Sequence, residues 1–145
     1  MRNLTFGRFF PAVVICASLL GCSHQPKPGE SIVEACAPAN ADKKVSVSGV
    51  LAMPSMISFC GDTCNFRLAK SSSEEKPYVS ISFRVGQGNA TMKELPKKFT
   101  QADVDIQDSN GKHIHVGDAV RLTGTLKLSP TSDCAMYSPE TIEAQ

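Results

Sequence analysis

The chain has few of the aromatic residues on which many binding surfaces rely. It contains no tryptophan, two tyrosines and seven phenylalanines in 145 residues, and 15 lysines and arginines nearly balance 14 aspartates and glutamates. Proteins that bind single-stranded nucleic acid combine stacking aromatics with a basic groove, and their affinity grows with the number of phosphates they neutralise. The composition therefore argues against a nucleic-acid partner, which stays only as an alternative.

The sequence also lacks the motifs of common enzyme classes. It has no Gly-x-Ser-x-Gly elbow, no phosphate-binding P-loop, no dinucleotide fingerprint and no His-Glu-x-x-His motif. Asp62, Asp103, Asp105 and Asp108 fall in polar loops or on expected outer faces, where a carboxylate is ordinarily solvated. Two carboxylates two residues apart do not by themselves indicate a hydrolase. We therefore expect no enzymatic activity and no cofactor.

What is present begins with an export signal. Arg2 and Arg8 supply positive charge, and residues 9–20 form an apolar run that is too short to span a bilayer as a stable helix. The run ends in Leu19-Leu20-Gly21-Cys22, followed by the polar Ser23. An ordinary secretory signal with an incidental cysteine is the alternative interpretation.

This motif resembles the lipobox of bacterial lipoproteins, in which a peptidase cleaves before a lipid-bearing cysteine. The resemblance implies a signal peptide at residues 1–21 and lipidation of Cys22. In such lipoproteins an acidic residue after the cysteine causes retention in the inner membrane, so Ser23 favours the outer membrane, with the domain facing the periplasm. Cleavage would leave 13 basic and 14 acidic residues in 124, which is enough chain for one domain.

Composition divides the remaining chain into two parts. Residues 22–41 contain Pro26, Pro28, Gly29 and Pro38 and few large apolar side chains, which is typical of an extended tether. Residues 42–145 should form the folded domain. Apolar residues there alternate with polar ones, which predicts strands at residues 45–53, 66–69, 79–85 and 120–128 and a short one near 140–144.

The segment at residues 86–116 interrupts this series of strands. A short helical turn is expected near residues 96–101, followed by a hairpin around Asn110-Gly111. A three-residue loop with Gly111 in the left-handed conformation would pair Ile106 with Ile114, Val104 with Val116, and Asp105 with His115.

Residues 45–53 and 120–128 carry a glycine at the same interior position, Gly49 and Gly124, where a tightly coiled barrel needs a bend. With the run at residues 116–126, this arrangement resembles the OB-fold. The resemblance implies an all-β, small five-stranded barrel with an inserted hairpin between its third and fourth strands. A small β-sandwich is the alternative fold.

OB domains usually bind ligands across strands 2 and 3, beside the loop that joins strands 1 and 2. The resemblance therefore implies a binding face made of Arg67, Tyr78, Ser80, Ser82 and Arg84, flanked by residues 58–63, with Tyr78 as its outward aromatic. The expected function is non-catalytic binding or scaffolding for a protein or glycan of the cell envelope. Nothing in the sequence indicates the oligomeric state.

Four cysteines remain in the exported part: Cys36, Cys60, Cys64 and Cys134. An even number in an exported domain predicts two disulfides, with three pairings open in principle. Cys60 and Cys64 flank a short loop that could bring them to bridging distance, which leaves Cys36 for Cys134.

The same loop supports a second hypothesis. Met53, Met56, Cys60 and Cys64 are soft sulfur ligands within twelve residues, and His113 and His115 share one face of the expected hairpin. Soft ligands favour Cu(I), so a copper-binding or thiol-redox protein is the alternative function. We favour a structural disulfide, with the two histidines on a solvated face and paired with Asp105.

Overall fold

The computed structural model describes residues 30–54, 60–72, 77–87, 91–129 and 134–145. The predicted signal, the lipobox and Met56 lie outside these residues. In the described part of the chain, no helix has the length and apolar character that crossing a membrane requires.

Five strands form a closed barrel. β1 (Lys44–Ala52) pairs with β2 (Thr63–Ala69), which pairs with β3 (Tyr78–Arg84). β3 then pairs with β8 (Cys134–Tyr137), β8 with β7 (Ala119–Leu128), and β7 with β1. Only the β3–β8 pairing in this circuit is parallel. The predicted five-stranded barrel is therefore confirmed, and the alternative β-sandwich is wrong because the sheet closes on itself.

The barrel core is built by the predicted alternation. Phe66, Leu68, Ile81 and Phe83 are buried in β2 and β3, and Leu122 and Leu126 in β7, while the residues between most of them face outward. Burying one face of each strand supplies the main favourable free energy of folding.

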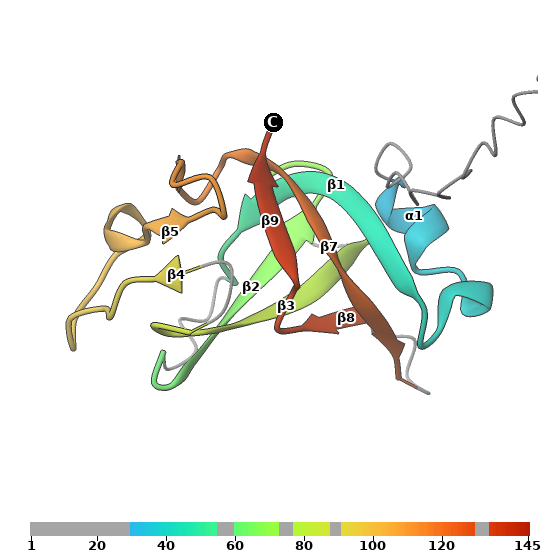
Figure 1. Cartoon of the computed structure of the whole chain (residues 1–145), viewed down its shortest axis with the longest axis horizontal. Coiled ribbons are helices and arrows are strands. Elements are labelled where there is room, and N and C mark those ends of the chain that lie inside the picture. The colour runs from blue at the N-terminus through green and yellow to red at the C-terminus, as the bar shows by residue number, and fades with distance from the viewer. Residues whose placement is uncertain (1–29, 55–59, 73–76, 88–90, 130–133) are drawn as a thin grey trace, which may run out of the picture.

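β1 bends so that it can serve two neighbours, as Figure 1 shows. Residues 44–50 pair with β7 and residues 50–52 with β2, so Val50 has both partners, and Gly49 lies directly before it. A Cβ atom on Gly49 would meet the backbone oxygen of Ala69 at 2.7 Å. The glycine is thus required by close backbone approach.

The fifth strand of the barrel is divided in two. β8 and β9 (Thr141–Ala144) lie one after the other along the same edge of β7. Residues 138–140 separate them, and Ser138 has a positive φ of 51°. The predicted strand at residues 140–144 corresponds to β9. Sequence alternation missed β8 because Cys134, Ala135 and Met136 are buried in succession.

Residues 30–43, the described segment before β1, belong to the folded domain. α1 (Ile32–Ala35) begins with a capping box between Ser31 and Glu34, and it buries Ile32 and Ala35 against the barrel. A short 3₁₀ helix, η1 (Pro38–Asn40), follows, and Glu30 forms a bridge with Val47. The predicted tether at residues 22–41 therefore includes packed residues, since the described part of it, residues 30–41, already lies against the barrel.

The insertion between β3 and β7 forms its own three-stranded sheet of β4 (Thr91–Met92), β5 (Ile106–Gln107) and β6 (His113–Ile114). Figure 1 shows it on the side of the barrel away from α1. Ile106 pairs with Ile114 and Gly111 has a φ of 81°, as predicted. The expected helical turn lies later, as the 3₁₀ helix η2 (Gln101–Asp103).

Candidate functional site

The predicted binding face lies on the outer surface of β2 and β3. Val79, Ile81 and Phe83 point into the barrel, so the residues that alternate with them point outward. Arg67 pairs across the strands with Ser80. The structure thus brings the five predicted residues onto one surface, which we call the β2–β3–β8 face: Arg67, Tyr78, Ser80, Ser82 and Arg84.

Arg67 and Tyr78 form a cation–π contact at one end of this face. The guanidinium carbon of Arg67 lies 4.3 Å from the centre of the Tyr78 ring. Such a contact is worth about 0.5–1 kcal/mol at an exposed site, and it holds both side chains in one orientation. Tyr78 is therefore partly covered by Arg67 rather than freely outward.

Small polar side chains form the floor beside this pair. Ser82 Oγ donates a hydrogen bond of 2.6 Å to Asn65 Oδ1, and Ser80 lies two residues along β3, opposite Arg67. Because serine is short, this part of the sheet leaves room for a ligand to approach the backbone.

Tyr137 borders the floor on the other side, and sequence analysis missed it. It is 64% exposed and lies directly opposite Ser82 in the parallel β3–β8 pairing. Tyr137 belongs to β8, which the sequence pattern did not predict, so the residue lay outside every predicted strand. Tyr137 rather than Tyr78 is the more exposed aromatic of the face.

A polar pocket of about 570 Å³ continues the face beyond Arg84. Residues 60–63 of the β1–β2 loop form one wall, as expected, while residues 55–59 lie outside the described chain. Asp62 and Glu94 line the same pocket as Arg84, so its lining carries charges of both signs. Within the described residues, Arg84 has no ion-pair partner, so its guanidinium is free to bind a ligand. The lining consists of Cys60, Gly61, Asp62, Thr63, Arg84, Val85, Gln87, Glu94 and Leu95.

Both predicted disulfides are present. Cys36 bonds to Cys134, and Cys60 bonds to Cys64 at the edge of the pocket. The sulfurs of Cys60 and Cys64 are thereby engaged with each other. Among the residues that the structure describes, no three His, Cys, Asp or Glu side chains gather around one metal position.

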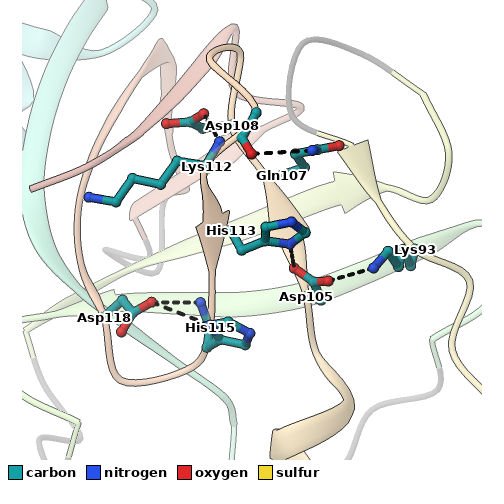
Figure 2. Close-up of polar contacts among 9 residues, drawn as sticks. Lys93, Asp105, Gln107, Asp108, Lys112, His113, His115 and Asp118 are labelled. Carbon is teal, nitrogen blue, oxygen red and sulfur yellow. Dashed lines mark hydrogen bonds and ion pairs between the residues drawn. The ribbon is translucent and has the colours of Figure 1, made fainter.

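The histidines lie in a separate polar network on the insertion (Figure 2). Asp105 accepts hydrogen bonds of 2.7 Å from Lys93 Nζ and from His113 Nδ1. The Lys93 bond, and then the His113 bond, hold the pKa of Asp105 below its ordinary range. The expected pair of Asp105 with His115 is not formed, because Asp105 reaches diagonally to His113. The carboxylate near His115 is instead that of Asp118, whose Oδ2 lies 3.8 Å from His115 Nδ1.

Two other carboxylates considered as catalytic candidates, Asp108 and Asp103, have structural contacts. Asp108 accepts hydrogen bonds of 2.8 Å from the backbone N–H groups of Lys112 and Asn110, which close the β5–β6 turn and lower its pKa. Asp103 caps η2 by accepting from Thr100, which lowers its pKa as well.

Comparisons with known proteins bear on the fold. No protein-family model and no curated protein sequence matches the chain. A putative aspartyl-tRNA synthetase from Leishmania major Friedlin is similar at 14% identity and a TM-score of 0.50, over 87% of this chain and 22% of that one. The fold is that of an OB barrel. Two OBodies bound to hen egg-white lysozyme, AM3L09 and AM1L10, match at 14% identity with TM-scores of 0.49 and 0.47; they cover 82% and 83% of this chain and 95% of their own chains.

The outer surface of β2 and β3 corresponds to the strand 2–3 surface that OB domains use for ligands in general. Identity this low carries the fold and no ligand, since one fold hosts many functions.

Proposed function

We propose that this chain is an envelope lipoprotein whose OB barrel is a non-catalytic binding module for a protein or glycan. The proposal places the lipid on Cys22 and the barrel at the periplasmic side of the outer membrane. Its support is the Leu19-Leu20-Gly21-Cys22 motif, with two disulfides in the domain that follows, since disulfides persist in oxidising compartments outside the cytosol.

The observation that carries the binding role is the exposed Tyr137 beside the serine floor. An aromatic ring of this exposure offers a large apolar contact at low cost in conformational entropy. The ordered Arg67–Tyr78 pair forms the opposite border of the same surface. A flat ligand, such as a sugar ring or an extended peptide, could lie between them and hydrogen-bond to Ser80 and Ser82.

Arg84, which has no ion-pair partner among the described residues, would orient the ligand. Its guanidinium can bind a carboxylate through two parallel hydrogen bonds, and the nearby Asp62 and Glu94 would favour an amine or hydroxyl group on the same ligand. This mixture of charges suits a peptide or glycan of the envelope better than a polyphosphate, which the two carboxylates would repel.

In-cell photo-crosslinking tests the binding role. A photoreactive amino acid replaces Tyr137 in one strain of the full-length protein and Val33 in a matched strain, because Val33 is similarly exposed, at 67%, but lies on α1. We expect a discrete cross-linked product from position 137 only, and its loss when Arg84→Ala is added. Equal labelling at both positions, or none at 137, would contradict a protein ligand on this face.

A glycan ligand is tested with isolated peptidoglycan. Purified full-length protein in detergent should sediment with peptidoglycan, and Tyr137→Ala should reduce the bound fraction while Val33→Ala leaves it unchanged. A single-stranded oligonucleotide serves as the control ligand, and preferential binding to it would support the nucleic-acid alternative. The anchor is tested separately, since Cys22→Ser should abolish incorporation of labelled palmitate.

A further inference from the structure

His113 and His115 project from the same face of the insertion hairpin. Ile114 between them is fully buried, so the alternation of an extended chain places both imidazoles on the outer side. Two residues of a strand span about 6.6 Å, which is within the range that two imidazoles can bridge to one ion. Figure 2 shows the two rings one after the other along this strand.

Each imidazole has a carboxylate at the same nitrogen. His113 Nδ1 donates to Asp105 Oδ1 at 2.7 Å, and His115 Nδ1 lies 3.8 Å from Asp118 Oδ2. Asp118 is itself fixed, because the same oxygen accepts a 2.8 Å hydrogen bond from the backbone N–H of His115. The hydrogen bond from His113 Nδ1 to Asp105 sets the tautomer in which Nε2 carries the free lone pair, an arrangement that metal-binding histidines use, and Asp118 lies where it can favour the same tautomer of His115.

The outer nitrogens are available. In the described part of the chain, neither Nε2 has a hydrogen-bond partner, and the His113 and His115 side chains are 50% and 54% exposed. The fold does not need His113 to neutralise Asp105, because Lys93 already forms an ion pair with that carboxylate. The two solvent-facing imidazoles therefore keep their outer nitrogens open to a ligand.

We propose that His113 and His115 form a surface site for a divalent transition metal, with Cu(II) preferred. Two imidazole nitrogens bind the ion and water completes its coordination, since no third ligand of the described chain converges there. Imidazole suits copper, nickel and zinc, and the usual order of affinity places Cu(II) first. Asp105 and Asp118 act as positioning residues and supply compensating negative charge.

This site differs from a sulfur-based Cu(I) site. Cys60 and Cys64 are joined in a disulfide and offer no thiolate. The proposed metal site also shares no residue with the β2–β3–β8 face, so the two proposals can be tested independently of each other.

Titration of the full-length protein in detergent with Cu(II), followed by electron paramagnetic resonance, tests the site. We expect one equivalent of copper with two coordinated imidazole nitrogens. His113→Ala and His115→Ala should each weaken the apparent Kd at least tenfold. The chain has a third histidine, His24, and His24→Ala is the matched control that should bind as the parent protein does.

Asp105→Ala separates positioning from ligation. Loss of a carboxylate behind a ligating histidine typically lowers metal affinity about 10–100-fold, and the spectrum should still show two nitrogens. Melting curves of the metal-free variants check that each one is folded. Parent-like binding by the His113 and His115 variants, or loss of binding only in His24→Ala, would overturn the proposal.

Discussion

Cys36 and Cys134 are 98 residues apart in sequence, yet their Cα atoms lie 5.7 Å apart and their sulfurs are bonded. Cys36 ends α1, and Cys134 begins β8, the strand that closes the barrel between β3 and β7. The bond therefore ties the first helix to the closing strand.

Removing this disulfide should cost far more stability than removing the other. The chain-entropy estimate gives about 4–5 kcal/mol for a loop of this length and about 2 kcal/mol for the four-residue separation of Cys60 and Cys64. The double variants C36S/C134S and C60S/C64S should differ accordingly in the free energy of unfolding, measured by chemical denaturation. Equal losses in the two variants would contradict the entropic account.

The two strand glycines should differ in their tolerance of a methyl group. Gly49→Ala brings a Cβ to 2.7 Å from the backbone oxygen of Ala69, which cannot move without breaking the β1–β2 pairing. We expect a loss of about 1–3 kcal/mol. Gly124→Ala meets chiefly the sulfur of Met136, at 2.8 Å, and a flexible methionine can shift. Its loss should therefore be smaller.

Gly61→Ala is the control for this pair, since nothing lies within 4 Å of its added Cβ. Thermal melting of the three variants should rank them Gly49→Ala least stable, then Gly124→Ala, then Gly61→Ala. The steric explanation fails if Gly61→Ala is as unstable as Gly49→Ala.

The insertion hairpin should lose stability in acid. Its hydrogen bonds hold the pKa values of Asp105 and Asp108 below the ordinary aspartate value of about 4, so the folded state binds these protons less readily than the unfolded state does. Their contribution is present above about pH 4 and is lost as the pH falls through the lowered values. Protection of the hairpin amides from hydrogen exchange should accordingly fall below pH 4.

Asp108→Asn provides the matched test, because the amide keeps the size of the side chain and removes its charge. Hairpin protection in this variant should be lower at neutral pH and should depend less on pH below about 4. An unchanged pH profile would show that Asp108 does not control the acid response.

Ile32 should anchor the N-terminal segment. It is 5% exposed in α1, and Ile32→Ala should lower the free energy of unfolding by about 2–5 kcal/mol, as for other large-to-small core changes. Val33→Ala alters the next residue, which is 67% exposed, and should leave stability unchanged. If both variants match the parent in urea denaturation, α1 does not contribute to the core.

Alternation predicted the barrel strands well because each of them buries one face. It did not predict β8, where three consecutive residues are buried. Without β8, the exposed Tyr137 could not be assigned to the binding face. The parallel neighbour β3 cannot be inferred from a segment of four residues, since that pairing joins parts of the chain more than fifty residues apart.

The N-terminal error had a signal that could have corrected it. Ser31 and Glu34 have the spacing of a capping box, and Ile32 and Ala35 have the spacing of one helical face. Prolines on both sides outweighed this local pattern. The contact of Asp105 with His113 matches the expected pairing of the histidines with this carboxylate, whereas its ion pair with Lys93 could not be predicted, because Lys93 comes from the neighbouring segment.

The packing of α1 also limits how far the barrel can stand from a membrane. With a lipid on Cys22, as proposed, about eight residues separate the anchor from Glu30, where the described chain begins. Even fully extended, eight residues reach at most about 26–29 Å. The domain would then stay within a thin layer next to the bilayer, so its ligand must come within that layer. A partner held in the same layer would meet the domain at a high local concentration.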